Sequence, residues 1–458
     1  MDLSTLKEEH KVRNRELYVR VRNLVKEAFF LLNEKIERGE KPFFRTVEYI
    51  SLADNGKLLV PPLGYRHYHV RPDLPLFIFK YRDELSKLPE WKLVLKSLSR
   101  DDVIHKHLRH EIKSPFGEPF FTDEYHLLSR IIWMSVDENS LFHFNSDIFD
   151  SVYNEVESYF YSKIVVRKSL CLLLGFDSEV QEIELGHGLR IRNVSKDEIL
   201  ELWRRSNWFR ALIEFSPVFR FTPLKYVLEL SIETPKIAKD KRIEPKFADP
   251  QFQTVLSALR LFKKGWVDYL FTWERVVSSL SATTTYSMKH SKALLSDGRP
   301  VGIPYRLSKA EAEDFREYFK RISKKIDYSK IPLKRFNETY QRIDPEDKLV
   351  DYMISFESLY LSGEEKSEMA YKLAHRVSLL LHKEEEKRKE TFLEMKKAYS
   401  LRSQIVHGGK IKSIKIPKLG KEYTVSEFVQ KIEKYLRSSI RLFLEKQKHS
   451  WIDLMFKK

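Results

Sequence analysis

The last third of the chain is the part whose sequence most restricts the fold. From residue 308 onward, apolar side chains recur every three to four positions, which places them on one face of an α-helix. Glycine, proline and polar turns divide this pattern into short segments, so several helices must pack together to bury their apolar faces. We expect helices at residues 308–325, 332–341, 345–361, 364–382, 385–407 and 425–447. The pattern predicts an all-α bundle over residues 301–458.

The residues before 300 follow a more varied pattern. An amphipathic helix is expected from Leu6 to Arg38, with Gly39 at its end. Short extended segments, turn residues and further helical runs follow it. We expect extended segments at 42–75, helices at 147–176 and 249–280, a hairpin around Gly186-His187-Gly188 and a strand at 219–232. The chain is therefore predicted to be mainly α, with a mixed α+β region (1–300) before the helical bundle (301–458). Turn residues at 297–304 mark this boundary, and a further seam is expected near 112–122.

Net charge and cysteine content restrict the classes of protein to which this chain can belong. The chain of 458 residues carries a net charge of +16, and 35 basic against 24 acidic residues place +11 of it in residues 301–458. This fits a polyanionic partner, although a lysine-rich solvated surface has the same composition. The single cysteine, Cys171, excludes a disulfide framework and a cysteine zinc site within one chain. The apolar runs are too short to cross a membrane and the N-terminus is not a signal peptide, so a soluble cytoplasmic protein is expected.

The end of the helix expected at 385–407 carries a basic and a titratable side chain. Arg402 and His407 close this helix, and Gly408 follows, a residue that ends helices because it adopts the left-handed conformation without strain. Arginine presents a planar fork to phosphate oxygens, and histidine transfers protons near neutral pH. In an unbroken helix the two side chains point about 140° apart, so the last turn would have to bend to bring them together.

The segment Tyr399-x-x-Arg402-Ser403-x-x-x-His407-Gly408 resembles the signature of HEPN domains, in particular their Apea-like branch. Two upstream segments, 353–361 and 374–381, fall where that family has its preceding helices. The resemblance covers about residues 309–448. It implies an all-helical bundle that often forms homodimers and cleaves RNA without a metal ion or other cofactor.

The resemblance also implies roles for individual residues. Arg402 and His407 match the catalytic residues of the family, and Ser403 matches the polar residue that commonly follows the arginine. Glu357 matches an acidic position in an earlier helix, where it is expected to pair with Arg402 or another cation. Tyr399, one helical turn before Arg402, is expected to pack beside the site or to line it.

A basic segment directly follows the candidate site. It runs from 410 to 421 and is expected to be a loop; its first lysines, Lys410, Lys412 and Lys415, are the candidate RNA-binding residues. Contact with RNA phosphates and a merely solvated loop are both compatible with this composition.

These features together predict a metal-independent endoribonuclease. His407 would withdraw the proton of a ribose 2′-hydroxyl, and Arg402 would stabilise the charge on the attacked phosphate, leaving 2′,3′-cyclic phosphate ends. A homodimer through the helical bundle is expected. The region 1–300 would sense an unidentified trigger or regulatory partner, or select RNA, in antiviral defence or a toxin–antitoxin type of stress response. The alternative is an inactive HEPN module for RNA binding or dimerisation.

Two clusters in the first region have competing interpretations. The strip from Tyr65 to Arg71 interleaves aromatic and basic residues, which fits either RNA contact or an ordinary amphipathic strand. His107, His110 and Glu111 lie close together on an expected helix, so residues 105–111 fit either a metal-dependent nuclease site or, more simply, a solvated helix face.

Overall fold

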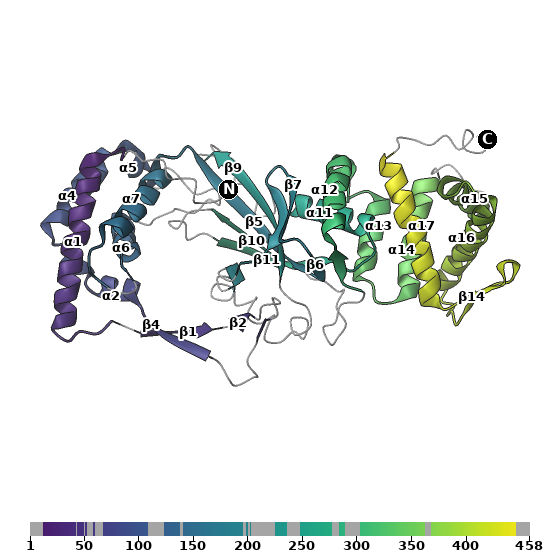
Figure 1. Ribbon diagram of the computed structural model, residues 1–458, viewed down its shortest axis with the longest axis horizontal. Coiled ribbons are helices and arrows are strands. Elements are labelled where there is room, and N and C mark those ends of the chain that lie inside the picture. Colours follow the sequence, from purple (N-terminus) through teal and green to yellow (C-terminus); the bar gives the residue numbers. More distant parts are fainter. Residues whose placement is uncertain are drawn as a thin grey trace.

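The structure, a computed structural model, describes residues 12–42, 44–49, 51–52, 58–59, 67–108, 123–137, 141–195, 198–199, 202, 225–235, 248–276, 284–288, 303–361 and 368–445. Within these ranges the protein is mainly helical and contains one six-stranded sheet. Figure 1 shows three parts along the long axis: a helical part in purple and blue, the sheet in the middle, and a second helical part in green and yellow. The expected seam at 112–122 and the turn at 297–302 lie outside the described residues.

The first helical part is built around its longest helix. Gly39, with φ +91°, lies just beyond the end of that helix, as predicted. One face buries leucine, valine and phenylalanine side chains from Leu17 to Leu32. The helices of this part are α1 (Arg15–Glu37), α2 (Leu74–Lys80), α3 (Arg82–Leu85), α4 (Pro89–Arg100), α5 (Asp102–Leu108), α6 (Glu124–Met134) and α7 (Ser146–Tyr161).

The predicted extended segments between residues 42 and 75 form two antiparallel pairs. β1 (Phe44–Tyr49) pairs with β4 (His67–Pro72), and β2 (Ser51–Leu52) pairs with β3 (Leu58–Leu59). The aromatic and basic strip therefore continues into β4, while its first residues, Tyr65 and Arg66, lie outside the described residues. In Figure 1 this ribbon runs below the sheet.

The central sheet is antiparallel throughout, in the order β11-β10-β5-β9-β8-β7. The predicted hairpin around Gly186-His187-Gly188 is confirmed, and all three of these residues have positive φ. A short parallel pair joins β6 (Phe176–Ser178) to β12 (Tyr305–Leu307). The strands of the sheet are β5 (Ile164–Leu174), β7 (Glu182–Gly186), β8 (Leu189–Asn193), β9 (Tyr226–Pro235), β10 (Asp268–Val276) and β11 (Thr284–Met288).

Two predicted helices are partly strands. The helix expected at 147–176 ends at Tyr161, and β5 follows it; the helix expected at 249–280 is α11 (Asp249–Phe262) followed by β10. The side chains from Leu170 to Leu174 are buried on both faces of the sheet. A continuous apolar run has no period that separates a buried strand from a buried helix, which explains both errors.

The predicted C-terminal helices are all present, and two of their starts have side-chain caps. Ser308 and Glu311 form a capping box, and Asp344 caps the helix that begins at Pro345. The helices are α12 (Lys309–Ile322), α13 (Ile331–Glu338), α14 (Pro345–Tyr360), α15 (Met369–Leu381), α16 (Glu385–Val406) and α17 (Val425–Glu445), with 3₁₀ turns η2 (Ser323–Lys325) and η3 (Thr339–Gln341).

The C-terminal part is not purely helical, which corrects the all-α prediction. The basic segment after α16 forms a hairpin of β13 (Ile414–Ile416) and β14 (Lys421–Tyr423), joined by the 3₁₀ turn η4 (Pro417–Leu419). Ile414 and Ile416 are buried while Lys415 between them is exposed. This alternation has the period of a strand, although it is too short to have been recognised against the lysine-rich background.

Buried side chains form two hydrophobic cores. The first extends from Leu17 to Phe160 and the second from Cys171 to Ile440, so the sheet and the C-terminal helices share one core. Helix α11, before residue 300, belongs to the second core, and its Arg260 carbonyl accepts a hydrogen bond from Arg437 of α17 at 2.8 Å. The division at residue 300 stays a prediction. No helix in the described ranges has the length and apolarity needed to cross a membrane.

Candidate functional site

Helix α16 positions the candidate catalytic residues. Its inner face buries Met395, Ala398 and Leu401 in the bundle. At its end the Gly408 N–H donates to the Ile405 carbonyl at 2.9 Å, and Gly408 has φ +81°. This left-handed glycine ends the helix as the sequence predicts, with His407 at its last turn.

Arg402 lies against Glu357 of α14. The Arg402 Nη2 atom is 3.8 Å from Glu357 Oε2, too far for a hydrogen bond but close enough for an ion pair. Both side chains are mostly buried, with exposed fractions of 30% and 20%. Arg402 Nε and Glu357 Oε1 are both shielded from solvent and have no hydrogen-bond partner among the residues that the structure describes. Burial raises the pKa of Glu357, and the Arg402 charge offsets only part of that increase.

Tyr399 and Ser403 flank the arginine. The Tyr399 hydroxyl lies 4.0 Å from the Met369 sulfur, and the ring is partly buried in the bundle. Burial raises the pKa of Tyr399, the Glu357 charge raises it further, and the Arg402 charge opposes this, so the three groups share one electrostatic environment. Ser403 is half-buried and contributes its carbonyl, which accepts a hydrogen bond from the His407 N–H at 3.2 Å.

His407 is exposed at the end of the helix. Helix α16 is continuous to Val406, and the His407 N–H still makes the helical bond to the residue four positions earlier. The last turn therefore does not bend in the way that would bring the imidazole to Arg402. Along a regular helix the two side chains leave about 140° apart and about 7.5 Å apart along the axis.

The candidate RNA-binding lysines lie on the surface around the hairpin that follows. Lys410, Lys412 and Lys415 are exposed, and Lys415 forms an ion pair of 3.4 Å with Glu422 across the hairpin. The Ile411 N–H donates to Glu346 Oε1 at 3.1 Å, which ties this segment to the first turn of α14. Lys415 is thus held in a β-hairpin, whereas Lys410 and Lys412 lie before β13 in a loop, as expected.

Of the alternative metal cluster, the structure describes His105, which is half-buried, and His107. His107 is 2% exposed, and its Nδ1 lies 2.7 Å from the Val103 carbonyl oxygen. Its ring packs edge-on against Phe160, so the expected solvated face is wrong for this residue. His110 and Glu111 lie outside the described residues. In the described ranges, no three histidine, cysteine or acidic side chains converge in a way that could hold a metal ion.

A buried polar cluster on α16 escaped the sequence analysis. Glu394 is completely buried and accepts hydrogen bonds from the Tyr423 and Tyr435 hydroxyls at 2.7 and 2.6 Å. One turn earlier, hydrogen bonds from Lys421 and Lys431 lower the pKa of Glu390 to about 2. The cluster ties the hairpin and α17 to α16. The feature of the sequence that could have indicated this cluster is a glutamate next to Met395, within the apolar stripe of the expected helix.

No known protein family, curated protein sequence or solved structure matches this chain. The functional argument therefore depends on the residues of the chain and their geometry, together with the motif resemblance at the end of α16.

Proposed function

We propose that the chain is a metal-independent endoribonuclease of the HEPN type. The observation that carries this proposal is how the Arg402 guanidinium is held in the structure. Its guanidinium is held by a long ion pair with Glu357 rather than by a hydrogen bond, and the side chain is 30% exposed. An arginine that is positioned but not saturated keeps donors for an anionic group such as an RNA phosphate.

The chemistry follows from the 2′-hydroxyl of RNA. His407 is exposed at the end of the same helix and would take the proton of the 2′-hydroxyl as this oxygen attacks the adjacent phosphorus. Arg402 would stabilise the negative charge that grows on the phosphate oxygens. The leaving 5′-oxygen takes up a proton, so the products carry a 2′,3′-cyclic phosphate and a 5′-hydroxyl.

We also propose that two copies of the chain form the active site. Because α16 is regular to its end, one chain directs Arg402 and His407 away from each other. In a two-fold dimer with facing C-terminal helices, Arg402 of one copy would act with His407 of the partner subunit. The exposed Lys410 and Lys412 would bind flanking phosphates, and the first region would select RNA or sense a trigger.

Cleavage of a labelled RNA in the presence of a chelator tests the chemistry. We expect the wild type to cut and to leave cyclic phosphate ends, and Arg402→Ala and His407→Ala to lose most activity. Lys396→Ala, an exposed residue on the same helix, is the control and should cut normally. Equal cleavage by all four proteins, or complete loss of wild-type cleavage in chelator, would contradict the proposal.

Mixing the two inactive variants tests the shared site. A dimer of Arg402→Ala with His407→Ala has one intact composite site and one that lacks both groups. With random assembly, about a quarter of the wild-type activity should return. No recovery, in a mixture shown to exchange subunits, would mean that both groups act within one chain.

The alternative is a module that binds RNA without cutting it. The separation of Arg402 and His407 along α16 favours this function if the chain stays monomeric. It predicts that the wild type binds RNA and leaves it intact, and that Arg402→Ala weakens binding while His407→Ala does not.

A further inference from the structure

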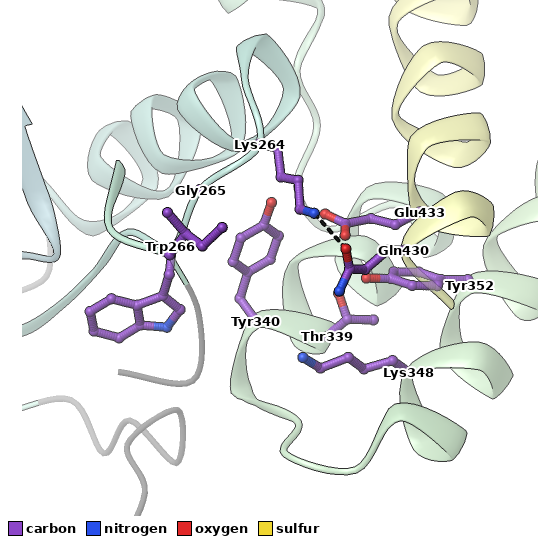
Figure 2. A pocket seen from close by; sticks show the side chains of 10 residues that line it. Lys264, Gly265, Trp266, Thr339, Tyr340, Lys348, Tyr352, Gln430 and Glu433 are labelled. Carbon is purple, nitrogen blue, oxygen red and sulfur yellow. Dashed lines mark hydrogen bonds between the residues drawn. The ribbon is translucent and has the colours of Figure 1, made fainter. Parts of the chain in front are cut away.

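A cavity of about 200 Å³ lies between the central sheet and the C-terminal helices, and none of its lining residues belongs to the candidate site at the end of α16. One side is the turn between α11 and β10, with Lys264 and Trp266. The other side comes from η3, α14 and α17, with Tyr340, Lys348 and Glu433 among the lining residues (Figure 2). The cavity thus joins segments that are about 75 to 170 residues apart in the chain.

The acceptors on the cavity wall are already engaged. The Gln430 side-chain oxygen accepts a hydrogen bond from Lys264 Nζ at 2.8 Å, which Figure 2 shows as a dashed line. The Glu433 carboxylate forms an ion pair with Arg437 of the same helix. These contacts leave the carboxylate and the amide oxygen of the wall with less capacity to bind a donor.

Two donors on the wall remain unsatisfied. Trp266 is 4% exposed, and its Nε1 atom is buried without a hydrogen-bond partner among the described residues. Figure 2 shows the nitrogen-bearing ring of Trp266 on the side nearer to Tyr340. Lys348 is half-buried, and in the described part of the chain its ammonium has no salt-bridge partner. Burial lowers the pKa of Lys348, and the Glu433 charge compensates only in part.

Positive charge also lies behind the wall. The Arg260 guanidinium is 4.3 Å from the centre of the Tyr340 ring, and Arg437 Nη2 lies 3.4 Å from the Tyr340 hydroxyl oxygen. Because the Tyr340 hydroxyl accepts from arginine, its own proton is free to point toward a ligand. Arg260 is ion-paired with Asp268 and Arg437 with Glu433, so the charge at the wall that favours an anion is that of Lys348. Unsatisfied donors beside this cation favour a ligand that is rich in acceptors and negatively charged.

We propose that this cavity binds a small organic phosphate ester, such as a phosphorylated five-carbon sugar. The phosphate accepts hydrogen bonds from Lys348 Nζ and Trp266 Nε1, and the organic part occupies the space toward Tyr340. At about 10–15 Å³ for each small group, the volume holds about fifteen non-hydrogen atoms. Because the ligand contacts both sides, it joins the turn before β10 to the C-terminal helices and stabilises their junction.

Calorimetry and thermal unfolding of the full-length chain test this proposal without any RNA. The probes are ribose 5-phosphate, uridine 5′-monophosphate, uridine and inorganic phosphate. We expect at least one ester to bind and to raise the Tm, uridine to have no effect, and inorganic phosphate to bind about tenfold or more weakly, since it fills little of the cavity. Absence of binding by both esters, or equal affinity for inorganic phosphate, would overturn the proposal.

Three variants locate the site. Lys348→Met removes the cation and Trp266→Phe removes one donor while keeping a ring; each should weaken ester binding about tenfold or more. Lys334→Met, an exposed lysine on α13, is the matched control and should bind normally. Lys348→Met should have an equal or higher Tm without ligand, because it removes a desolvated charge, so its loss of binding cannot be due to unfolding. Equal losses in Lys334→Met and Lys348→Met would place the binding elsewhere and overturn the assignment.

Discussion

The Arg402 guanidinium on α16 lies 3.8 Å from the Glu357 carboxylate on α14, and each side chain keeps one buried polar atom without a hydrogen bond. The pair is close enough to orient the arginine and too far apart to saturate it. Glu357 thus orients the arginine that is proposed to bind phosphate. The charge state of Glu357 affects the stability of the fold, and this effect can be measured as a function of pH.

The first prediction concerns Glu357→Gln. Burial raises the pKa of Glu357 above its usual value, so its contribution to stability is present at low pH, where it is protonated, and is lost as the pH rises through the folded-state pKa. The variant should match the wild type at about pH 4 and be more stable at about pH 7. Thermal unfolding across this pH range measures the difference. Glu422→Gln, an exposed control, should show little change, and a Glu357→Gln protein that is less stable at neutral pH would contradict the argument.

The second prediction concerns a buried carboxylate in the sheet. Glu229 is fully buried; burial alone would raise its pKa, but Arg192, Lys168 and its hydrogen bonds lower the pKa to about 2. Its stabilising contribution is therefore present above its ordinary pKa and is lost as the pH falls toward 2. Glu229→Gln should reduce the free energy of unfolding by about 3–5 kcal/mol at neutral pH, because two arginines lose their buried partner.

Denaturant unfolding at neutral and acidic pH measures this effect. The loss should shrink as the pH falls toward 2, since the wild-type carboxylate is then protonated as well. Glu184→Gln on β7, which β8 separates from β9, is the control: its exposed side chain lies 3.8 Å from Arg190, so the change should be less than about 1 kcal/mol. Equal losses of unfolding free energy in both variants would show that the buried ion pairs of Glu229 stabilise the fold no more than the exposed ion pair of Glu184.

The third prediction compares two glycines with positive φ. A Cβ atom on Gly175, at φ +71°, would lie 2.2 Å from Cε3 of Trp266, whereas one on Gly39, at φ +91°, would have no atom within 4 Å. Gly39→Ala should cost about 1 kcal/mol from backbone strain alone. Gly175→Ala adds a steric clash and should cost about 2–4 kcal/mol. Denaturant unfolding measures the free energy of unfolding of each variant. Similar decreases in the two variants would argue against close packing of Trp266 on Gly175.

The fourth prediction concerns the lysines after α16. Binding of single-stranded RNA is measured by fluorescence anisotropy over a series of salt concentrations, in a His407→Ala background that leaves the RNA uncut. Replacing Lys410 and Lys412 with glutamine should reduce the salt slope by about 1.4, at about 0.7 for each lost phosphate contact. The same double change at Lys324 and Lys325, exposed on η2, is the control. An unchanged salt slope in the Lys410 and Lys412 variant would show that these lysines do not contact RNA phosphates.

Features with a local physical cause were predictable from the sequence. The helix ends at Gly39 and Gly408 follow from the conformational freedom of glycine, and the start at Pro345 follows from proline and its capping aspartate. A cation beside Glu357, either Arg402 or another, was also expected, because a glutamate in an apolar helix needs a cation nearby; the structure shows that it is Arg402. Each of these arguments uses residues within a few positions or one complementary charge.

Features that depend on distant neighbours were not predictable. The apolar run from Leu170 to Leu174 becomes a strand because β9 and β10 pair with it on both sides, and those strands lie about 50 and 100 residues away. His107 is buried because Phe160 of another helix covers it. The cavity with Trp266 and Lys348 exists only where the turn before β10 meets α14 and α17.

The sequence by itself therefore determined the helices of the C-terminal part, their caps, and which residues close α16, since hydrogen bonding and side-chain period act over one or two turns. Only the tertiary structure decided which apolar runs became strands, that Arg402 and His407 stay apart within one chain, and where unsatisfied donors gather. These outcomes depend on which surfaces are buried together, and burial is set by contacts between segments far apart in the chain.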